Sequence, residues 1–320
     1  MSSKTDKAKY IMYLWPNMYF EQPGLGHMKE IARTLITESY AYRRIAILPP
    51  LIPNKMHNPK YKVPLRWFEY FDWSDFDTRD LELDNKIKLL EFIKSFDNVR
   101  ILIDDNEPNI SFYKDELIIR LFKTQNIWGE WIKNREEINS KLLEPTFSEN
   151  YPKKIWDQAT SIIQEFGSFR GVMHIRRGDL AGKETDPEQI FKYLESKNAE
   201  KNDCIFVLTN ENDSNYYQIL KSNYPRMIFE KDIKELKLID NYKIFRICKC
   251  IQSRTDMLNL GTLRFMKTVT QVSIYRRILT RIDNKFINLI NKNNLITLEL
   301  IEKAISKNKN NINDNIIKFD

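Results

Sequence analysis

A charged cluster follows a short apolar run near the middle of the chain, within residues 171–184 (GVMHIRRGDLAGKE). The apolar residues predict a buried strand, with Arg176, Arg177 and Asp179 at or just past its carboxyl end. In open α/β sheets, ligands bind at the carboxyl ends of strands. Two adjacent guanidinium groups suit a diphosphate there, because they stay charged and pair with phosphate oxygens bidentately. A salt-bridged turn, with Asp179 pairing to Arg177, is the structural alternative, and the strand-borne His174 favours the anion site.

Further candidate groups stand at the ends of other predicted strands in the same half. The buried run 204–209 ends in Thr209 and a polar turn, and the strand 257–261 lies between Asp256 and Thr262. Arginines that hold a diphosphate, together with an acid that accepts from a base edge, describe a nucleoside diphosphate site. A nucleotide-sugar is a natural ligand for such a site. A fixed arginine stabilises the leaving diphosphate without a metal ion.

A glycine-containing loop follows the first predicted strand, residues 9–16. Gly24, Gly26 and His27 lie in this loop, before a predicted helix. The glycines let the backbone approach a ligand closely, but the third glycine of the dinucleotide fingerprint is missing. A tight turn before the helix is therefore an equally good interpretation. The sequence has no Walker-type glycine loop and no Asp-x-Asp pair after a strand, which argues against kinases and metal-dependent transferases.

Strands and helices alternate along the chain, which predicts an α/β fold. The expected strands cover residues 9–16, 44–48, 99–103, 171–175, 204–209, 227–229 and 257–261. The expected helices cover residues 28–36, 81–96, 156–166, 214–220, 241–254 and 263–279. On the helix at 241–254, we expect Ile244, Phe245, Ile247, Cys248 and Ile251 to share one apolar face. Residues 104–150 show no clear pattern.

The proline-containing stretch 144–152 marks a boundary between two domains. We expect a first Rossmann-like domain at residues 1–150, on the acceptor side, and a second, nucleotide-sugar-binding one at 151–282. Both would be doubly wound, with the ligand in the cleft between them. The Asn-, Ile- and Lys-rich tail at 283–320 is expected to be partly helical.

Composition excludes several classes of protein. The chain of 320 residues is 42% hydrophobic and 30% charged, which is ordinary for globular proteins. Six of its seven excess positive charges lie in residues 1–10 and 276–320, whereas a nucleic-acid binder more often carries a basic stripe on its folded body. Three cysteines give no disulfide framework. Without a signal peptide or an apolar span of about 20 residues, we expect a cytoplasmic protein with neither a nucleic-acid partner nor a membrane span.

The stretch His174–Asp179 (HIRRGD) resembles the His-x-Arg-Arg-x-Asp motif of the GDP-fucose-dependent fucosyltransferases. This family includes the core α1,6-fucosyltransferases, the nodulation-factor fucosyltransferases and the protein O-fucosyltransferases. Further similarity to the α1,6 enzymes lies in Asp179–Glu184 (Asp-x-x-Gly-x-Glu), Phe206–Asn210 (a strand ending in Thr-Asp), Tyr224-Pro225 and Asp256–Thr262. In the first half, Gly24–Gly26, a helix and then residues 47–50 resemble the opening of the O-fucosyltransferases.

The resemblance implies a GT-B-like fold, in which two Rossmann-type domains face a central cleft. It also implies GDP-fucose as donor, a glycan hydroxyl as acceptor, and metal-independent transfer with inversion at the sugar carbon. By position, Arg176 would hold the β-phosphate and be the residue most needed for turnover. His174 and Asp256 would contact guanine, while Arg177 and Asp179 would brace the motif.

Other positions are carried over from the same resemblance. Thr262 would lie near the phosphates, and Thr209, Gly24, Gly26 and His27 would complete the donor site. Glu184 falls where the α1,6 enzymes have a carboxylate proposed to help deprotonate the acceptor hydroxyl, and an inverting transfer needs such a base.

The sequence also departs from the family pattern. Leu180 replaces a lysine of the α1,6 enzymes, Asn210 replaces an acid, and His27 replaces an asparagine of the O-fucosyltransferases. Two alternatives stay open: a transferase of the same fold that uses another donor such as GDP-mannose, and a non-catalytic protein that binds nucleotide-sugars or glycans. Structural roles also stay open for a core histidine at His174 and a solvated acid at Glu184.

Overall fold

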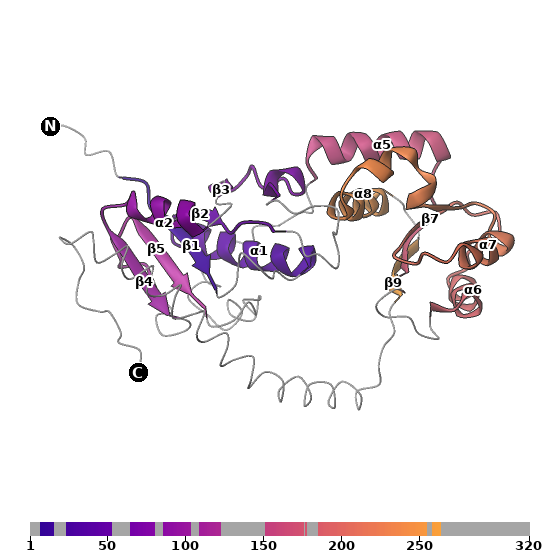
Figure 1. Cartoon of the computed structure of the whole chain (residues 1–320), viewed down its shortest axis with the longest axis horizontal. Helices are drawn as coiled ribbons and strands as arrows, with labels where there is room; N and C mark the ends of the chain where they lie inside the picture. Colours follow the sequence, from indigo (N-terminus) through magenta and orange to yellow (C-terminus); the bar gives the residue numbers. More distant parts are fainter. Residues whose placement is uncertain are drawn as a thin grey trace, which may run out of the picture. The chain divides into compact units, whose positions relative to one another are not determined.

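The computed structural model describes residues 7–15, 24–52, 65–80, 86–103, 109–122, 151–175, 177, 185–254 and 258–263. The chain divides into two compact units, with the described residues up to 122 in the first and those from 151 onward in the second. Each unit is mixed α/β and contains its own parallel sheet (Figure 1). The predicted fold class of two α/β halves with parallel strands is therefore confirmed. The predicted tail at 283–320 and the helix at 263–279 lie outside the described residues.

The first unit has a five-stranded parallel sheet in the order β3-β2-β1-β5-β4. Its strands are β1 (Tyr10–Leu14), β2 (Ile45–Leu48), β3 (Thr78–Asp80), β4 (Val99–Ile103) and β5 (Leu117–Leu121). The central strand β1 is buried along its whole length, as expected for a parallel sheet that is covered on both faces. Strands β1, β2 and β4 agree with the sequence prediction, whereas β3 and β5 were not predicted.

The helices in the described part of the first unit are α1 (Leu25–Ala41), α2 (Lys86–Lys94) and the 3-10 turn η1 (Trp67–Glu69). The predicted helical spacing in α1 is confirmed, because Met28, Ile31 and Leu35 are fully buried. The buried surface of α1 also carries a charge. The Glu38 carboxylate accepts from Arg120 of β5, at 2.8 Å from Nε to Oε1, and from the Tyr13 hydroxyl of β1 at 2.6 Å. Both charged side chains are inaccessible to solvent.

The second unit has a four-stranded parallel sheet in the order β8-β7-β6-β9. Its strands are β6 (Gly171–Ile175), β7 (Ile205–Thr209), β8 (Met227–Phe229) and β9 (Leu258–Leu263). Its helices are α5 (Lys153–Phe166), α6 (Pro187–Ser196), α7 (Ser214–Asn223) and α8 (Asn241–Ser253), with 3-10 turns η3 (Glu230–Asp232) and η4 (Lys234–Leu238). All four strands agree with the sequence prediction to within two residues at each end. Helix α7 is capped at its N-terminus, because the Asp213 carboxylate accepts from the main-chain N–H of Asn215 at 2.9 Å.

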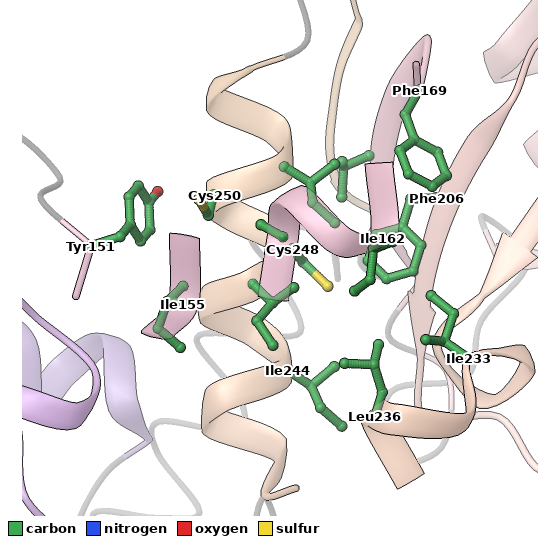
Figure 2. Close-up of a cluster of buried hydrophobic side chains, with 14 of the residues drawn as sticks. Tyr151, Ile155, Ile162, Phe169, Phe206, Ile233, Leu236, Ile244, Cys248 and Cys250 are labelled. Atoms are coloured by element: carbon green, nitrogen blue, oxygen red, sulfur yellow. The ribbon is translucent and has the colours of Figure 1, made fainter. Parts of the chain in front are cut away.

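Helices cover both faces of the second sheet. On one face, Val172 of β6 and Phe206 of β7 pack in one apolar core with side chains of α5 and α8. Figure 2 shows side chains of the two helices together with Phe206 in this core. Met173 of β6 packs instead in a second core with α6 and α7. Alternate strand residues thus serve opposite faces. The three cysteines are free and buried, and no helix in the described part of the chain is long and apolar enough to cross a membrane.

One side chain of α8 departs from the predicted pattern. Ile244, Ile247, Cys248 and Ile251 are buried as expected, but Phe245 is only partly buried. The buried part of α8 also includes Tyr242, Arg246 and Cys250, which the predicted apolar face did not contain.

Candidate functional site

The carboxyl end of β6 lies between those of β7 and β9. Ile175, the last residue of β6, is paired with Thr209 of β7, and His174 is paired with Thr262 of β9. The structure therefore brings these predicted site residues to one edge of the second sheet, with Arg177 just beyond it. Four other predicted residues lie outside the described part of the chain: Arg176, Asp179, Glu184 and Asp256.

The Arg177 side chain is held by protein groups from two segments, the residues before α6 and the turn after β7. Its Nε donates to the Glu211 carboxylate at 2.6 Å, and one terminal nitrogen donates to the Asp186 carboxylate at 3.0 Å. The same nitrogen donates to the Thr185 main-chain carbonyl at 3.1 Å. The main-chain N–H of Arg177 donates to the Asn210 side-chain oxygen at 2.7 Å. A guanidinium has five N–H donors, and two carboxylates already surround that of Arg177. This side chain can therefore hold the residues before α6 and the turn after β7 together.

An aromatic ring completes the surroundings of this guanidinium. The guanidinium carbon of Arg177 lies 4.6 Å from the centre of the Tyr216 ring, at cation–π distance. The Tyr216 hydroxyl donates to the Thr185 carbonyl at 2.7 Å. Burial raises the pKa of Tyr216, so the phenol stays protonated. The start of α6 and the first turn of α7 are thereby tied to the end of β6.

The Glu211 carboxylate is the main anchor of Arg177. Its second oxygen accepts from the main-chain N–H groups of Asn212 at 2.7 Å and Asp213 at 3.0 Å. Burial opposes ionisation of this carboxyl, but the two N–H groups and the Arg177 guanidinium outweigh it and lower the pKa of Glu211. The Glu211 main-chain N–H donates to the Thr209 hydroxyl at 3.1 Å. The turn after β7 therefore has a fixed conformation and a fixed negative charge.

A second acid lies on the other side of Thr209. The Glu230 carboxylate, which directly follows β8, accepts from the Thr209 main-chain N–H at 3.3 Å. Burial raises the pKa of Glu230 to about 7, although the main-chain N–H groups of Glu230 and Thr209 counteract it. This edge of the sheet thus carries an ionised carboxylate at Glu211 and a carboxyl that titrates near neutrality at Glu230. Groups with shifted pKa values are often found at functional sites.

His174 lies on the face of β6 that α8 covers. It is partly buried, and the centre of its ring is 6.1 Å from that of Phe245, in an edge-to-face arrangement. The side chain of His174, the residue predicted to contact guanine, therefore lies between β6 and α8 and not inside the apolar core.

The residues of the predicted glycine loop lie in the first unit, but α1 begins at Leu25, so Gly26 and His27 are in the first turn of the helix and not in a loop. Gly24 is the N-cap of α1, and its carbonyl accepts from the main-chain N–H of His27 at 3.0 Å. The space beside the Gly26 Cα is open. No acidic side chain lies in the first turn of α1 itself, the place where an acid would interact favourably with the helix dipole.

Five residues of the site were not singled out as site residues from the sequence: Thr185, Asp186, Tyr216, Glu230 and Phe245. Asp186 precedes the Pro187 that begins α6, a usual helix-start signal, but that signal does not predict a partner for Arg177. Glu230 follows a predicted strand, as the other site residues do. In the described residues, no group of three or more His, Cys, Asp or Glu side chains is arranged to hold a metal ion.

No protein-family model matches the sequence, and no curated protein matches it. Among solved structures, the chain is similar to the fucosyltransferase NodZ from Bradyrhizobium, with 9% identity, 78% of this chain and 84% of that chain covered, and a TM-score of 0.37. It is also similar to NodZ alpha-1,6-fucosyltransferase co-crystallized with GDP (9% identity, 78% and 84% covered, TM-score 0.34) and soaked with GDP-fucose (9%, 78% and 85%, TM-score 0.38). With TM-scores this low, the function proposed below is drawn from the residues of this chain.

Proposed function

We propose that the protein is an inverting, metal-independent fucosyltransferase that transfers fucose from GDP-fucose to a glycan hydroxyl. One observation carries the proposal. The segment that resembles the fucosyltransferase motif begins on β6, with His174 in the strand and Arg177 fixed just beyond its carboxyl end. This is the end of a parallel strand at which α/β proteins bind ligands.

The contacts of Arg177 support a division of roles between the two adjacent arginines. Arg177 is engaged by Glu211 and Asp186, so its charge is balanced by protein groups. In the proposal, Arg176 neutralises the β-phosphate as GDP leaves, which lowers the barrier because negative charge accumulates there. Asp179 supports the motif together with Arg177.

The proposed reaction is a displacement at the anomeric carbon of fucose. The acceptor oxygen forms a bond to that carbon, the bond from the carbon to the phosphate oxygen breaks, and GDP leaves. Glu184 takes the proton of the acceptor hydroxyl. His174 and Asp256 bind guanine, and Thr209 and Thr262 lie on the phosphate side.

A two-domain, GT-B-like arrangement is part of the proposal. In it, Gly24, Gly26 and His27 at the N-terminus of α1 in the first unit face the donor across a cleft. Support comes from the open space beside Gly26 and from the α1 N-terminus, which favours a negatively charged group.

The proposal is tested by replacing Arg176. Arg176→Ala is expected to lower transfer from labelled GDP-fucose by at least about a hundredfold, on the scale of a lost transition-state donor, without changing the melting temperature. Arg33→Ala, on the exposed side of α1, is the matched control and keeps its activity. Near-normal transfer by Arg176→Ala would contradict the proposal.

Two further measurements separate the alternatives. A donor panel that includes GDP-mannose distinguishes a fucosyltransferase from another transferase of the same fold. GDP binding without hydrolysis or transfer, across an acceptor array, would identify a non-catalytic binding protein instead.

A further inference from the structure

Helix α8 buries its large apolar side chains with one exception. Tyr242, Ile244, Ile247 and Ile251 are all at most 6% exposed, but Phe245 is partly exposed. Because residues four apart share one side of a helix, Phe245 lies on a stripe with Asn241 and Lys249, which are likewise not buried. This stripe is therefore distinct from the core-facing side of α8.

The position of the Phe245 ring is set by a strand residue. Its centre is 6.1 Å from that of His174, with 68° between the two ring planes. Val172, two residues earlier on the same face of β6, is part of the apolar core with α8. Toward the carboxyl end of β6, the core thus gives way to a partly exposed pair of rings, and the Lys249 ammonium lies 5.9 Å from the centre of the phenyl ring.

This pair of rings lies at the point where the connections of the sheet change sides. From β6, the chain continues through α6 on one face toward β7, whereas α8 on the other face leads into β9, the opposite neighbour of β6. In open α/β sheets, the crevice at such a switch point is where ligands bind. A partly exposed aromatic ring at that place offers a flat apolar surface, and nucleic-acid bases stack on such rings whatever their hydrogen-bonding edge.

We propose that Phe245 stacks on the base of the bound nucleotide, so that α8 provides one wall of a base pocket beside His174. The inference rests on the proposed function, which makes a guanine nucleotide the ligand. Phe245 contributes to binding of the base and takes no part in the bond that breaks. The ligand chemistry it requires is a planar heterocyclic base linked to a diphosphate.

The test compares two ligands that differ in having a base. Binding of GDP and of inorganic pyrophosphate to the full chain is measured by titration calorimetry. Phe245→Ala is expected to weaken GDP binding by about fivefold to a hundredfold, the range for loss of one stacking contact. Pyrophosphate binding is expected to stay unchanged, because pyrophosphate has no base. Phe245→Tyr keeps the ring and is expected to keep the GDP affinity. Phe245→Leu keeps apolar volume but is expected to lose most of the GDP affinity that the stacked ring contributes.

A matched control is available on the opposite face of the sheet. Phe191 of α6 is also partly buried and stacks on Tyr224, with ring centres 6.0 Å apart. Phe191→Ala removes the same side chain and is expected to leave both affinities unchanged, while thermal unfolding shows that each variant is folded. If Phe245→Ala does not fold, Phe245→Leu and Phe245→Tyr carry the comparison.

Three results would overturn the inference: equal weakening of GDP and pyrophosphate, unchanged GDP affinity in a folded Phe245→Leu, or a wild-type chain that binds no nucleoside diphosphate. A wild-type chain that prefers uridine or adenine nucleotides would instead refute the proposed donor. The same comparison with the preferred nucleotide would then still decide the role of Phe245.

Discussion

The buried ion pair between Glu38 and Arg120 gives a sharp prediction for the first unit. Both side chains are inaccessible to solvent, and Arg120 donates to the carboxylate through Nε at 2.8 and 3.0 Å and through a terminal nitrogen at 2.5 Å. Arg120→Met leaves a buried carboxylate that keeps the hydrogen bond from the Tyr13 hydroxyl but has lost its cationic partner. Removing one partner of such a pair costs about 3–5 kcal/mol, because the remaining charge stays buried.

Replacing Tyr13, the third residue of this buried group, is expected to cause a smaller loss of stability. Tyr13→Phe removes one hydrogen bond of 2.6 Å to a charged acceptor, and the expected loss is about 1.5–3 kcal/mol. The double variant Glu38→Leu, Arg120→Met removes both charges and restores apolar packing. It is expected to be more stable than Arg120→Met alone, since replacing a whole buried pair is often close to neutral.

Urea unfolding followed by tryptophan fluorescence measures these free energies, because Trp15, Trp67 and Trp73 are buried in the first unit. The second unit serves as an internal reference, and its transition is expected to keep the same midpoint. The reasoning is refuted if Arg120→Met costs less than about 1 kcal/mol, or if the double variant loses as much stability as the single variants Glu38→Leu and Arg120→Met added together.

The remaining predictions concern the second unit. The pKa of Glu230 is raised to about 7 by burial, so its contribution to stability is full below pH 4.5 and is lost as the pH rises through 7. In wild-type protein the urea midpoint should fall between pH 5 and 8, and Glu230→Gln should make this fall smaller, by about 1–2 kcal/mol for this partly exposed group. An unchanged dependence of the midpoint on pH would refute the raised pKa of Glu230. Among the described residues, Arg177→Met leaves Glu211 with its main-chain donors. It should cost about 1–3 kcal/mol, whereas Arg170→Met, whose ion pair with Asp203 is longer at 3.6 Å, should cost less; equal losses in thermal unfolding would contradict this ranking.

Apolar runs were sufficient to predict most strands, and particular residues explain the exceptions. β5 reads Leu-Ile-Ile-Arg-Leu, and its arginine breaks the apolar pattern. That residue is buried because its partner, Glu38, lies 82 residues earlier in the chain, a contact that no local pattern contains. β3 is three residues long and polar, so its place at the sheet edge comes from pairing with β2 alone.

The candidate site was predictable in its location but not in its partners. The end of β6 and the polar turn after β7 were both identified by residue type, and strand pairing brings them together. Asp179, which the alternative of a salt-bridged turn pairs with Arg177, lies outside the described residues, and the described carboxylate partners of Arg177 are Glu211 and Asp186. Choosing among acids requires loop geometry, which depends on how α6 and α7 pack.

The contacts of Arg177 also bear on when this part of the protein can form during synthesis. Its most distant carboxylate partner is 34 residues ahead in sequence, and the tyrosine under its guanidinium lies in the first turn of α7. The whole arrangement is therefore encoded in one short stretch, and it can assemble as soon as the ribosome has released the chain through α7. Glu38 and Arg120 are 82 residues apart in sequence, so their ion pair forms only after the chain through β5 has emerged. The first unit, although it is synthesised earlier, therefore depends on a contact of longer sequence separation.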